Sequence, residues 1–413
     1  MHSKIAVFKL ENSYIDKEID LMIQLIEKAP EKRLRLQYLD GLRGLAAVYV
    51  VLVHIEPSIG EQLPNWLQLF IKTLRYGRVS VVVFIILSGY VLMASVVRSK
   101  NGYVAGGLLG YIKRRSRRIL PPYYATLFFC VLLAAAIFIL EKFTSFQWNE
   151  IAGKGPFSPY FSLSDFGYHL LLIHNLIPGA YMSINPPLWT VATEWQLYFI
   201  FPLFLLPIWR RFGLTSVVIA AFLIGIAPLY LFNGLFETAS PWFLGLFALG
   251  MAAADIGLSQ KSKLIAMRNS LPWGVLTIIF TGVAFLTEWR KLGLHIWISE
   301  SFFGLASACL FIYCTKFAIA DKKLPSILRV FEHPIAIALG VFSYSLYLTH
   351  GPVLVLVRYF LFSLQLSPVL FAVTSYTLGL ATSLVIAYLF YLLFERPFMS
   401  GFLKKRKVKD AVS

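Results

Sequence analysis

The sequence predicts an all-α, polytopic membrane protein with about ten transmembrane helices and both termini in the cytoplasm. Composition is the first indication: of 413 residues, 58% are hydrophobic and only 14% are charged, with a mean hydropathy of +0.70. A soluble domain carries about 25% charged residues, so this chain has too few to cover a water-facing surface. The other two indications are the lengths of its apolar segments and the positions of its basic residues.

A helix that crosses a bilayer needs about 20 apolar residues. Segments of about this length are predicted to span at 42–58, 79–97, 119–140, 188–208, 213–232, 241–258, 271–287, 296–316, 335–357 and 368–394. The apolar stretch at 167–177 is too short to cross. It is predicted to be a re-entrant or interfacial part of a long outer loop at 141–187.

The basic residues set the predicted orientation. With the N-terminus inside, the cytoplasmic segments hold 28 Lys and Arg residues and the outer segments hold 8. Cytoplasmic loops of membrane proteins carry such an excess, which places both termini in the cytoplasm. The net charge of +17 therefore reflects topology, and we expect no nucleic-acid partner.

Three parts are expected along the chain. Residues 1–35 form a cytoplasmic N-terminal segment without a removable signal peptide, 36–398 form the membrane domain, and 399–413 form a basic cytoplasmic tail. Within the first part, helical spacing of apolar residues at 15–28 favours either an amphipathic helix on the membrane or a segment packed against a cytoplasmic loop. Cys130, Cys309 and Cys314 lie in apolar runs without metal-type spacing and are interpreted as packing residues.

Two ionisable residues stand out in the first predicted span. Arg43 and His54 are 11 residues apart, close to three helical turns, so their side chains share a face about 16 Å apart along the axis. If each residue is considered alone, Arg43 could be a snorkelling anchor at the membrane boundary and His54 could be a packing histidine. Their shared face favours a functional role, because ionisable groups inside a bilayer are costly.

Glu194 and His350 are predicted to lie near the depth of His54. Glu194 follows the outer edge of the fourth span by about six residues, and His350 falls in the outer half of the ninth. Two histidines and a glutamate from three helices could thus converge at one level. The alternative is a structural polar network that joins the helices.

Two further groups of residues have alternative interpretations. Ser88, beside Gly89 near the middle of the second span, more readily indicates close helix packing than a serine nucleophile. Arg115 and Arg118 lie just before Pro121 in the basic segment that also serves as a topology signal. These two arginines could in addition hold the phosphates of a cytosolic donor.

Seven ordered motifs resemble the acyltransferase type 3 family, which includes bacterial O-acetyltransferases of cell-surface polysaccharides and enzymes that acylate macrolides. The resemblance covers about 36–398. The motifs are the Arg43-to-His54 spacing, FIILSGYVL at 84–92, RRSRRILPPYY at 114–124, LWTVATEWQLYF at 188–199, FLGLFALGM at 243–251, SYSLYLTH at 343–350 and FERPF at 394–398. The family's usual Trp-Ser-Leu-x-x-Glu appears here as WTVATE, which keeps a hydroxyl and the glutamate.

The resemblance implies transfer of an acyl group, usually acetyl from acetyl-CoA, to a hydroxyl of a sugar or another acceptor. Acyl-CoA would be a donor substrate, with no permanently bound cofactor and no metal. Its phosphates would stay at Arg43, Arg115 and Arg118, while its pantetheine arm runs beside the first helix. The protein would be a multi-pass component of the bacterial inner membrane, with a carbohydrate acceptor and the lipid bilayer as its other partners.

In this interpretation His54 is the general base that takes the proton of the acceptor hydroxyl, and Glu194 orients its imidazole. His350 or Tyr198 would donate to the oxyanion. An acyl-histidine intermediate is equally compatible with the sequence. The main alternative function is a multi-pass transporter of a small polar or acylated substrate, which would also place ionisable residues between helices.

Overall fold

The computed structural model describes residues 36–55, 63–99, 101–148 and 155–399. Internal contacts divide the chain into Met1–Leu36 and Gln37–Ser413, and every described helix belongs to the second unit. The predicted N-terminal segment, and the basic tail from residue 400 onward, lie outside the described residues.

The described part of the chain is helical throughout and contains no strand, as the sequence predicts. Its α-helices are α2 (Gln37–His54), α3 (Asn65–Thr73), α4 (Gly77–Val97), α5 (Gly107–Phe143), α7 (Leu163–Leu170), α8 (Leu188–Ile200), α9 (Leu206–Leu231), α10 (Phe243–Leu258), α11 (Ser262–Ser270), α12 (Trp273–Thr287), α13 (Ile296–Ile319), α14 (Pro334–Val341), α15 (Ser343–Ser363) and α16 (Pro368–Phe390). Short 3₁₀ and π segments are η2 (His174–Leu176), η3 (Phe201–Leu205), η4 (Glu237–Ala239), η5 (Arg290–Leu292), η6 (Ser326–Glu332), η7 (Tyr391–Glu395) and η8 (Arg396–Phe398).

Seven helical stretches in the described residues are long and apolar enough to cross a membrane, or eight if the bent pair α11 and α12 is one span. The sequence predicts ten, and two features account for the difference. Helix α2 carries Asp40 and Arg43 and is not among the seven. The stretch Leu188–Leu231 counts once, although its backbone leaves helical geometry at Gly213, where the fifth predicted span begins. The exact number of crossings stays a prediction.

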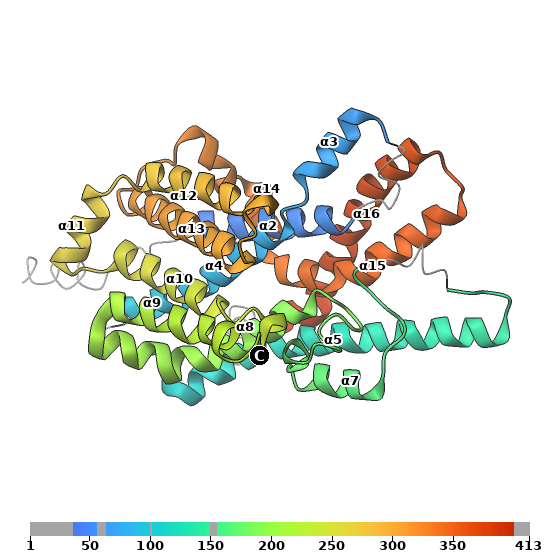
Figure 1. The fold of residues 1–413 in the computed structure, drawn as a ribbon, viewed down its shortest axis with the longest axis horizontal. Helices are drawn as coiled ribbons and strands as arrows, with labels where there is room; N and C mark the ends of the chain where they lie inside the picture. Colours follow the sequence, from blue (N-terminus) through green and yellow to red (C-terminus); the bar gives the residue numbers. More distant parts are fainter. Residues whose placement is uncertain (1–35, 56–62, 100, 149–154, 400–413) are drawn as a thin grey trace, which may run out of the picture. The chain divides into compact units, whose positions relative to one another are not determined.

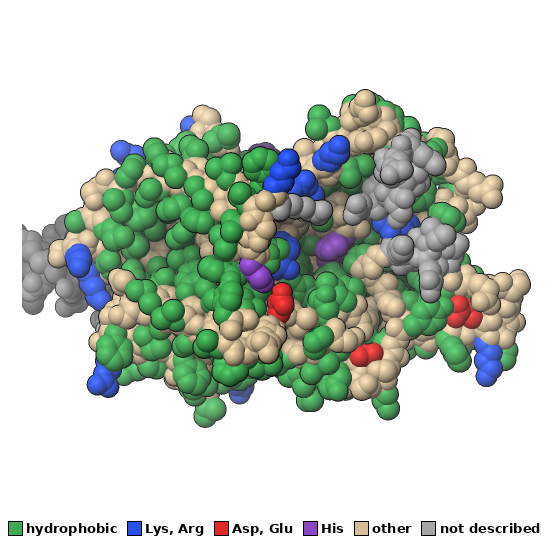
Figure 2. Space-filling model, in the orientation of Figure 1, with side chains coloured by type: hydrophobic (Ala, Val, Ile, Leu, Met, Phe, Trp, Pro, Cys, Tyr) green, Lys and Arg blue, Asp and Glu red, His purple; other side chains and the backbone are tan. Residues whose placement is uncertain are grey.

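The surface of the described unit suits a lipid environment. Figure 2 shows mostly apolar side chains on one face, with a few charged and histidine side chains gathered near its centre. Many large apolar side chains are exposed, including Leu109, Ile278 and Leu393. Apolar patches of this extent mark a membrane or protein contact. The protein is therefore a multi-pass membrane protein.

Glycines allow the central helices to approach closely. Helices α4, α10 and α13 contact one another and lie side by side in Figure 1. A Cβ at Gly250 of α10 would come within 2.0 Å of the Ile86 carbonyl oxygen, and one at Gly89 of α4 within 2.1 Å of the Phe247 carbonyl oxygen. Gly89, the residue after Ser88, thus has the close-packing role that the sequence predicts for this position.

Helix α2 packs against α14, and glycines again allow the two backbones to approach closely. A Cβ at Gly340 would meet the Asp40 carbonyl oxygen at 2.0 Å, and one at Gly44 would meet the Ala336 carbonyl oxygen at 2.4 Å. The ninth predicted span, 335–357, is in fact two helices, because Phe342 leaves helical geometry with φ −116° and ψ 17°. This break separates α14 from α15, which carries His350.

One further boundary differs from the sequence prediction, and one short stretch agrees with it. Helix α5 begins at Gly107, after Gly106 in the left-handed conformation (φ 71°), and continues through Pro121 and Pro122. The basic segment predicted as a loop up to residue 118 is therefore helical, which fixes its arginines on a rigid element. The stretch 167–177 covers the end of α7 and η2, and neither is long enough to cross a membrane, as predicted.

Candidate functional site

Helices α2, α4, α5, α8 and α15 surround a cavity with about 840 Å³ of empty space. We call it the arginine cavity. Its polar lining residues are Arg43, Ser88, Arg115, Arg118, Thr190, Glu194, Tyr198, Ser343, Tyr344 and Tyr347. Six of the eight residues proposed from the sequence line this cavity, and the two histidines do not.

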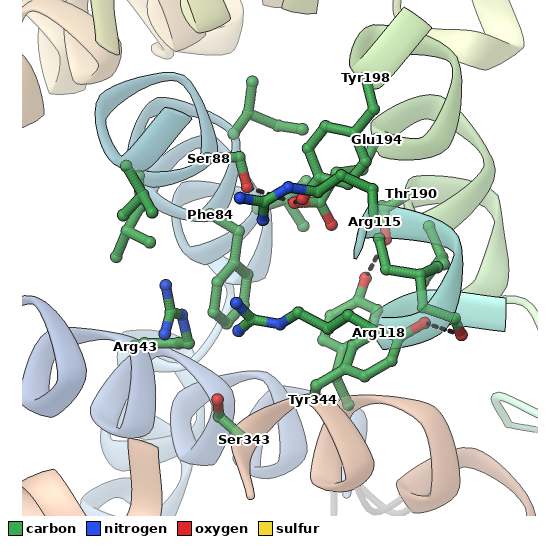
Figure 3. Close-up of a pocket in the computed structure, with 17 residues that line it drawn as sticks. Arg43, Phe84, Ser88, Arg115, Arg118, Thr190, Glu194, Tyr198, Ser343 and Tyr344 are labelled. Carbon is green, nitrogen blue, oxygen red and sulfur yellow. Dashed lines mark hydrogen bonds between the residues drawn. The ribbon is translucent and has the colours of Figure 1, made fainter. Parts of the chain in front are cut away.

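The three arginines come from two helices and point into the same space (Figure 3). Arg43 lies one turn after Asp40 of α2, and their side chains are 3.6 Å apart. Arg115 and Arg118 lie one turn apart on α5, and in the described part of the chain neither has an ion-pair partner within 4.0 Å. Such a concentration of positive charge in a largely apolar cavity favours an anionic ligand.

Arg115 is the most informative of the three. Its guanidinium lies over two aromatic rings, 5.7 Å from the centre of Tyr198 and 5.9 Å from that of Tyr111. Its Nε atom is buried without a hydrogen-bond partner among the described residues. A buried donor without an acceptor is costly, so this atom is suited to donate to a ligand oxygen.

Glu194 supplies the acidic group of the arginine cavity. Its Oε1 atom accepts hydrogen bonds from the Ser88 hydroxyl of α4 and, at 2.5 Å, from the Tyr198 hydroxyl one turn along α8. The Ser88 hydroxyl therefore holds the carboxylate rather than acting as a free nucleophile. Three guanidinium groups against one carboxylate leave the cavity with a net positive charge.

The structure does not bring Glu194 to His54. Glu194 lines the same cavity as Arg43, whereas His54 is 11 residues beyond Arg43 on α2, about 16 Å along the axis. No hydrogen bond or ion pair joins Glu194 to His54 in the described part of the chain, and their convergence at one level stays a prediction. Each predicted span takes its depth from its own apolar boundary, and an error of a few residues moves a side chain by several ångströms.

His54 pairs with His350 instead. His54 Nδ1 and His350 Nε2 are 3.0 Å apart, and the two rings are tilted by 31° with centroids 5.0 Å apart. His350 Nδ1 also lies 3.2 Å from the Leu346 carbonyl oxygen. Of the residues predicted to converge, the two histidines do so.

The hydrogen bonds of this pair assign the protons. A carbonyl oxygen can only accept, so His350 Nδ1 carries a hydrogen and His350 Nε2 is the acceptor of the neutral ring. His54 Nδ1 must then donate to it, which leaves the lone pair of His54 on Nε2. The pair thus holds His54 in the tautomer whose Nε2 atom can take a proton.

Tyr347 connects the histidine pair to the arginine cavity, and sequence reasoning missed it. Its ring lies 5.8 Å from that of His350 and 5.7 Å from that of Phe84, and its hydroxyl is 2.6 Å from the Thr190 hydroxyl. Tyr347, Phe84 and Thr190 all line the cavity. Helical spacing could have indicated two of them, because Tyr347 lies three residues before His350 and Thr190 four before Glu194.

The FERPF motif has a structural explanation. The buried Glu395 of η7 accepts hydrogen bonds from the Ser345 hydroxyl at 2.6 Å and the Ser345 amide at 3.2 Å. Ser345 is close to the start of α15, so this carboxylate fixes the helix that carries Tyr347 and His350.

Comparisons with known proteins agree with the motifs. The chain is 26% identical over 342 residues to O-acetyltransferase OatA of Staphylococcus aureus strain NCTC 8325 / PS 47, covering 78% of this chain and 51% of the relative. It is 24% identical over 384 residues to SACOL0978 of strain COL, an O-acetyltransferase candidate by its name, covering 87% of this chain and 56% of the relative. The chain thus spans just over half the length of these relatives. No solved structure matches it. The model of the Acyltransferase domain family matches residues 36–392, and the chain belongs to this family.

Proposed function

We propose that this protein is a membrane-embedded O-acyltransferase that moves an acyl group, acetyl first among them, from acyl-CoA to a hydroxyl of a sugar. The acceptor would be a cell-surface polysaccharide or its lipid-linked precursor. Family membership and the O-acetyltransferase names of the relatives support the reaction class. The arrangement that carries the proposal is a positively charged cavity that leads, through Tyr347, to a histidine with a free Nε2 lone pair.

The arginine cavity is suited to the donor. CoA carries phosphates at one end and its thioester at the other, so it needs a cationic binding site and a route into the protein. Arg43, Arg115 and Arg118 supply the cations, and the cavity between five helices supplies the route. The thioester would lie near Phe84 and Tyr347, beside the histidine pair.

The chemistry then follows from the tautomer of His54. Its Nε2 takes the proton of the acceptor hydroxyl as the oxygen attacks the thioester carbonyl. A carbon–oxygen bond forms, the carbon–sulfur bond breaks, and the imidazolium returns the proton to the departing thiolate. His350 keeps Nδ1 of His54 engaged and so presents Nε2 to the acceptor. The rings of Phe84 and Tyr347 must turn aside for the thioester to reach this atom.

The proposal refines the roles of two residues. Tyr198 donates to Glu194 at 2.5 Å, and the Tyr347 hydroxyl donates to Thr190, whose own hydrogen goes to the Pro187 carbonyl oxygen. Tyr347 is the oxyanion donor in this proposal because its ring contacts His350, and its hydroxyl must turn from Thr190 to the oxyanion. Glu194 would act in the arginine cavity, where its fixed carboxylate balances and orients the guanidinium groups. Its predicted role as a partner of His54 is replaced in this proposal by His350.

The proposed membrane arrangement keeps ten spans, with both termini in the cytoplasm of a bacterial cell and the protein in the inner membrane. The 28-to-8 distribution of basic residues supports it. In this orientation Arg43 and the start of α5 face the cytoplasm, where acyl-CoA is made, and His54 lies toward the outer side.

The function is tested with the purified full-length protein and radiolabelled acetyl-CoA. We expect free CoA to be released, and label to enter carbohydrate, when a cell-envelope fraction is added. Mass spectrometry of envelope glycans from cells with and without the gene should show a matching loss of acetyl groups. Absence of both label transfer and a mass difference would contradict the proposal.

A further inference from the structure

A second, smaller hollow reaches His54 from outside the arginine cavity. Besides His54, its lining includes Ile55, Pro156, Arg358, Ser375 and Gly379, from the end of α2, the segment before α7, and helices α15 and α16. We call it the histidine hollow. It has no lining residue in common with the arginine cavity. The two spaces are therefore separate in this conformation.

The order of contacts places the two spaces at opposite ends of the histidine pair. Tyr347, a wall of the arginine cavity, contacts His350; His350 is fully buried and contacts His54; and His54 lines the histidine hollow. A ligand in the arginine cavity thus meets the His350 end of the pair. A ligand in the histidine hollow meets His54 directly.

Two polar groups of the histidine hollow, on His54 and Ser375, are available to a ligand. His54 is only partly buried, and its hydrogen bond to His350, through Nδ1, leaves Nε2 with its lone pair. Ser375 of α16 is only 6% exposed, and its hydroxyl has no hydrogen-bond partner among the described residues. A hydroxyl-bearing ligand would satisfy both groups, donating to one and accepting from the other.

The size of the histidine hollow limits what can enter. It has about 280 Å³ of empty space, a third of that in the arginine cavity. The histidine hollow therefore suits a slender part of a larger molecule. Gly379 contributes to this space, because a Cβ there would come within 3.1 Å of Leu354 and 3.4 Å of Ile55.

We propose that the acceptor reaches His54 through the histidine hollow, whereas the thioester of the donor reaches the same histidine from the arginine cavity once Phe84 and Tyr347 turn aside. This inference rests on the proposed function and specifies the acceptor: a molecule that presents its hydroxyl on a narrow arm, as a hydroxymethyl group does. Ser375 hydrogen-bonds this hydroxyl and directs its proton to His54 Nε2. The bulk of the acceptor stays outside the hollow.

The test measures chemical access to His54 without using enzyme turnover. Ser375→Cys is introduced into the full-length protein, whose three native cysteines are buried, and is capped with a bulky methanethiosulfonate reagent. Carbethoxylation of His54 by diethylpyrocarbonate is then quantified by peptide mass spectrometry. Ser383→Cys is the matched control, since Ser383 is also on α16, is buried without a hydroxyl partner among the described residues, and does not line the hollow.

We expect the reagent to modify the thiol at position 375, and the cap to reduce His54 carbethoxylation at least tenfold, while the Ser383→Cys protein keeps its His54 reactivity. Failure of the reagent to reach position 375 would overturn the proposal. So would His54 reactivity that persists after capping. Failure of the proposed function is distinct: the unmodified protein would release no CoA, whatever the labelling pattern.

Discussion

His54 Nδ1 lies 3.0 Å from His350 Nε2, and His350 Nδ1 lies 3.2 Å from a backbone carbonyl oxygen, so one histidine sets the tautomer of the other. In a Ser-His-Asp triad an aspartate performs this task. Here a neutral imidazole does so, from a helix that Glu395 fixes in place. The Nε2 atom of His54 keeps its lone pair.

The first prediction concerns His350 as a positioning residue. His350→Ala should lower kcat by about 10–100-fold, the usual loss when a residue that orients a functional imidazole is removed. His350→Gln should restore part of the rate if its amide oxygen accepts the His54 Nδ1 hydrogen. Acetyl-CoA affinity should stay unchanged in both variants. A purely structural role would instead give equal losses in both, in proportion to the loss of folded protein.

The second prediction concerns donor binding by the arginine cavity. Arg115→Gln should weaken CoA binding about 10–100-fold, because a hydrogen bond to a charged group contributes roughly 1.5–3 kcal/mol. Arg117→Gln is the matched control, since Arg117 lies on the same helix, is exposed and does not line the cavity. Titration calorimetry with CoA measures both. Equal affinities in the two variants would show that the cavity does not hold the phosphates.

The third prediction concerns the crossing of α4 and α10. Gly250→Ala should lower the melting temperature in detergent strongly, because the new methyl group would clash with the Ile86 carbonyl oxygen. Gly282→Ala, in α12, has no atom within 4 Å of the added Cβ and should be neutral or slightly stabilising. Similar melting temperatures for the two variants would contradict the close helix packing.

Much of this arrangement could be predicted from the sequence. Arg43, Arg115, Arg118 and Glu194 stand out as ionisable groups near apolar segments, and they do line one cavity. The pairing of His54 with His350 also follows from depth along two helices. The apolar segments of the sequence indicate which parts are buried in lipid or protein. The basic residues indicate on which side of the membrane each connecting loop is expected.

What could not be predicted depends on packing between distant helices. Glu194 accepts hydrogen bonds from Ser88 and Tyr198 in the arginine cavity, and the pairing of α8 with α4 cannot be read from either segment alone. The close approach of α2 and α14 is set by Gly44 and Gly340, and no local pattern reveals that partner. The break at Phe342 and the early start of α5 were missed for the same reason: both interrupt or extend an otherwise continuous pattern.

The fourth prediction concerns membrane orientation. A cysteine introduced at Ser99, between α4 and α5, should be shielded from an impermeant thiol reagent in intact cells, and one at Ser158 should react. Both positions are at least partly exposed, so access depends on the side of the membrane. Permeabilised cells, in which both should react, provide the control. Labelling at position 99 but not 158 would invert the arrangement.

The central claim is that His54 is the general base, and activity per folded molecule of His54→Ala tests it most directly. Acyl transfer from acetyl-CoA should fall by about 10²–10⁴-fold, the usual contribution of a positioned general base. Melting temperature and CoA affinity should stay close to those of the unmodified protein, because His54 is only partly buried and lies outside the arginine cavity. Near-normal turnover by well-folded His54→Ala protein would contradict the account.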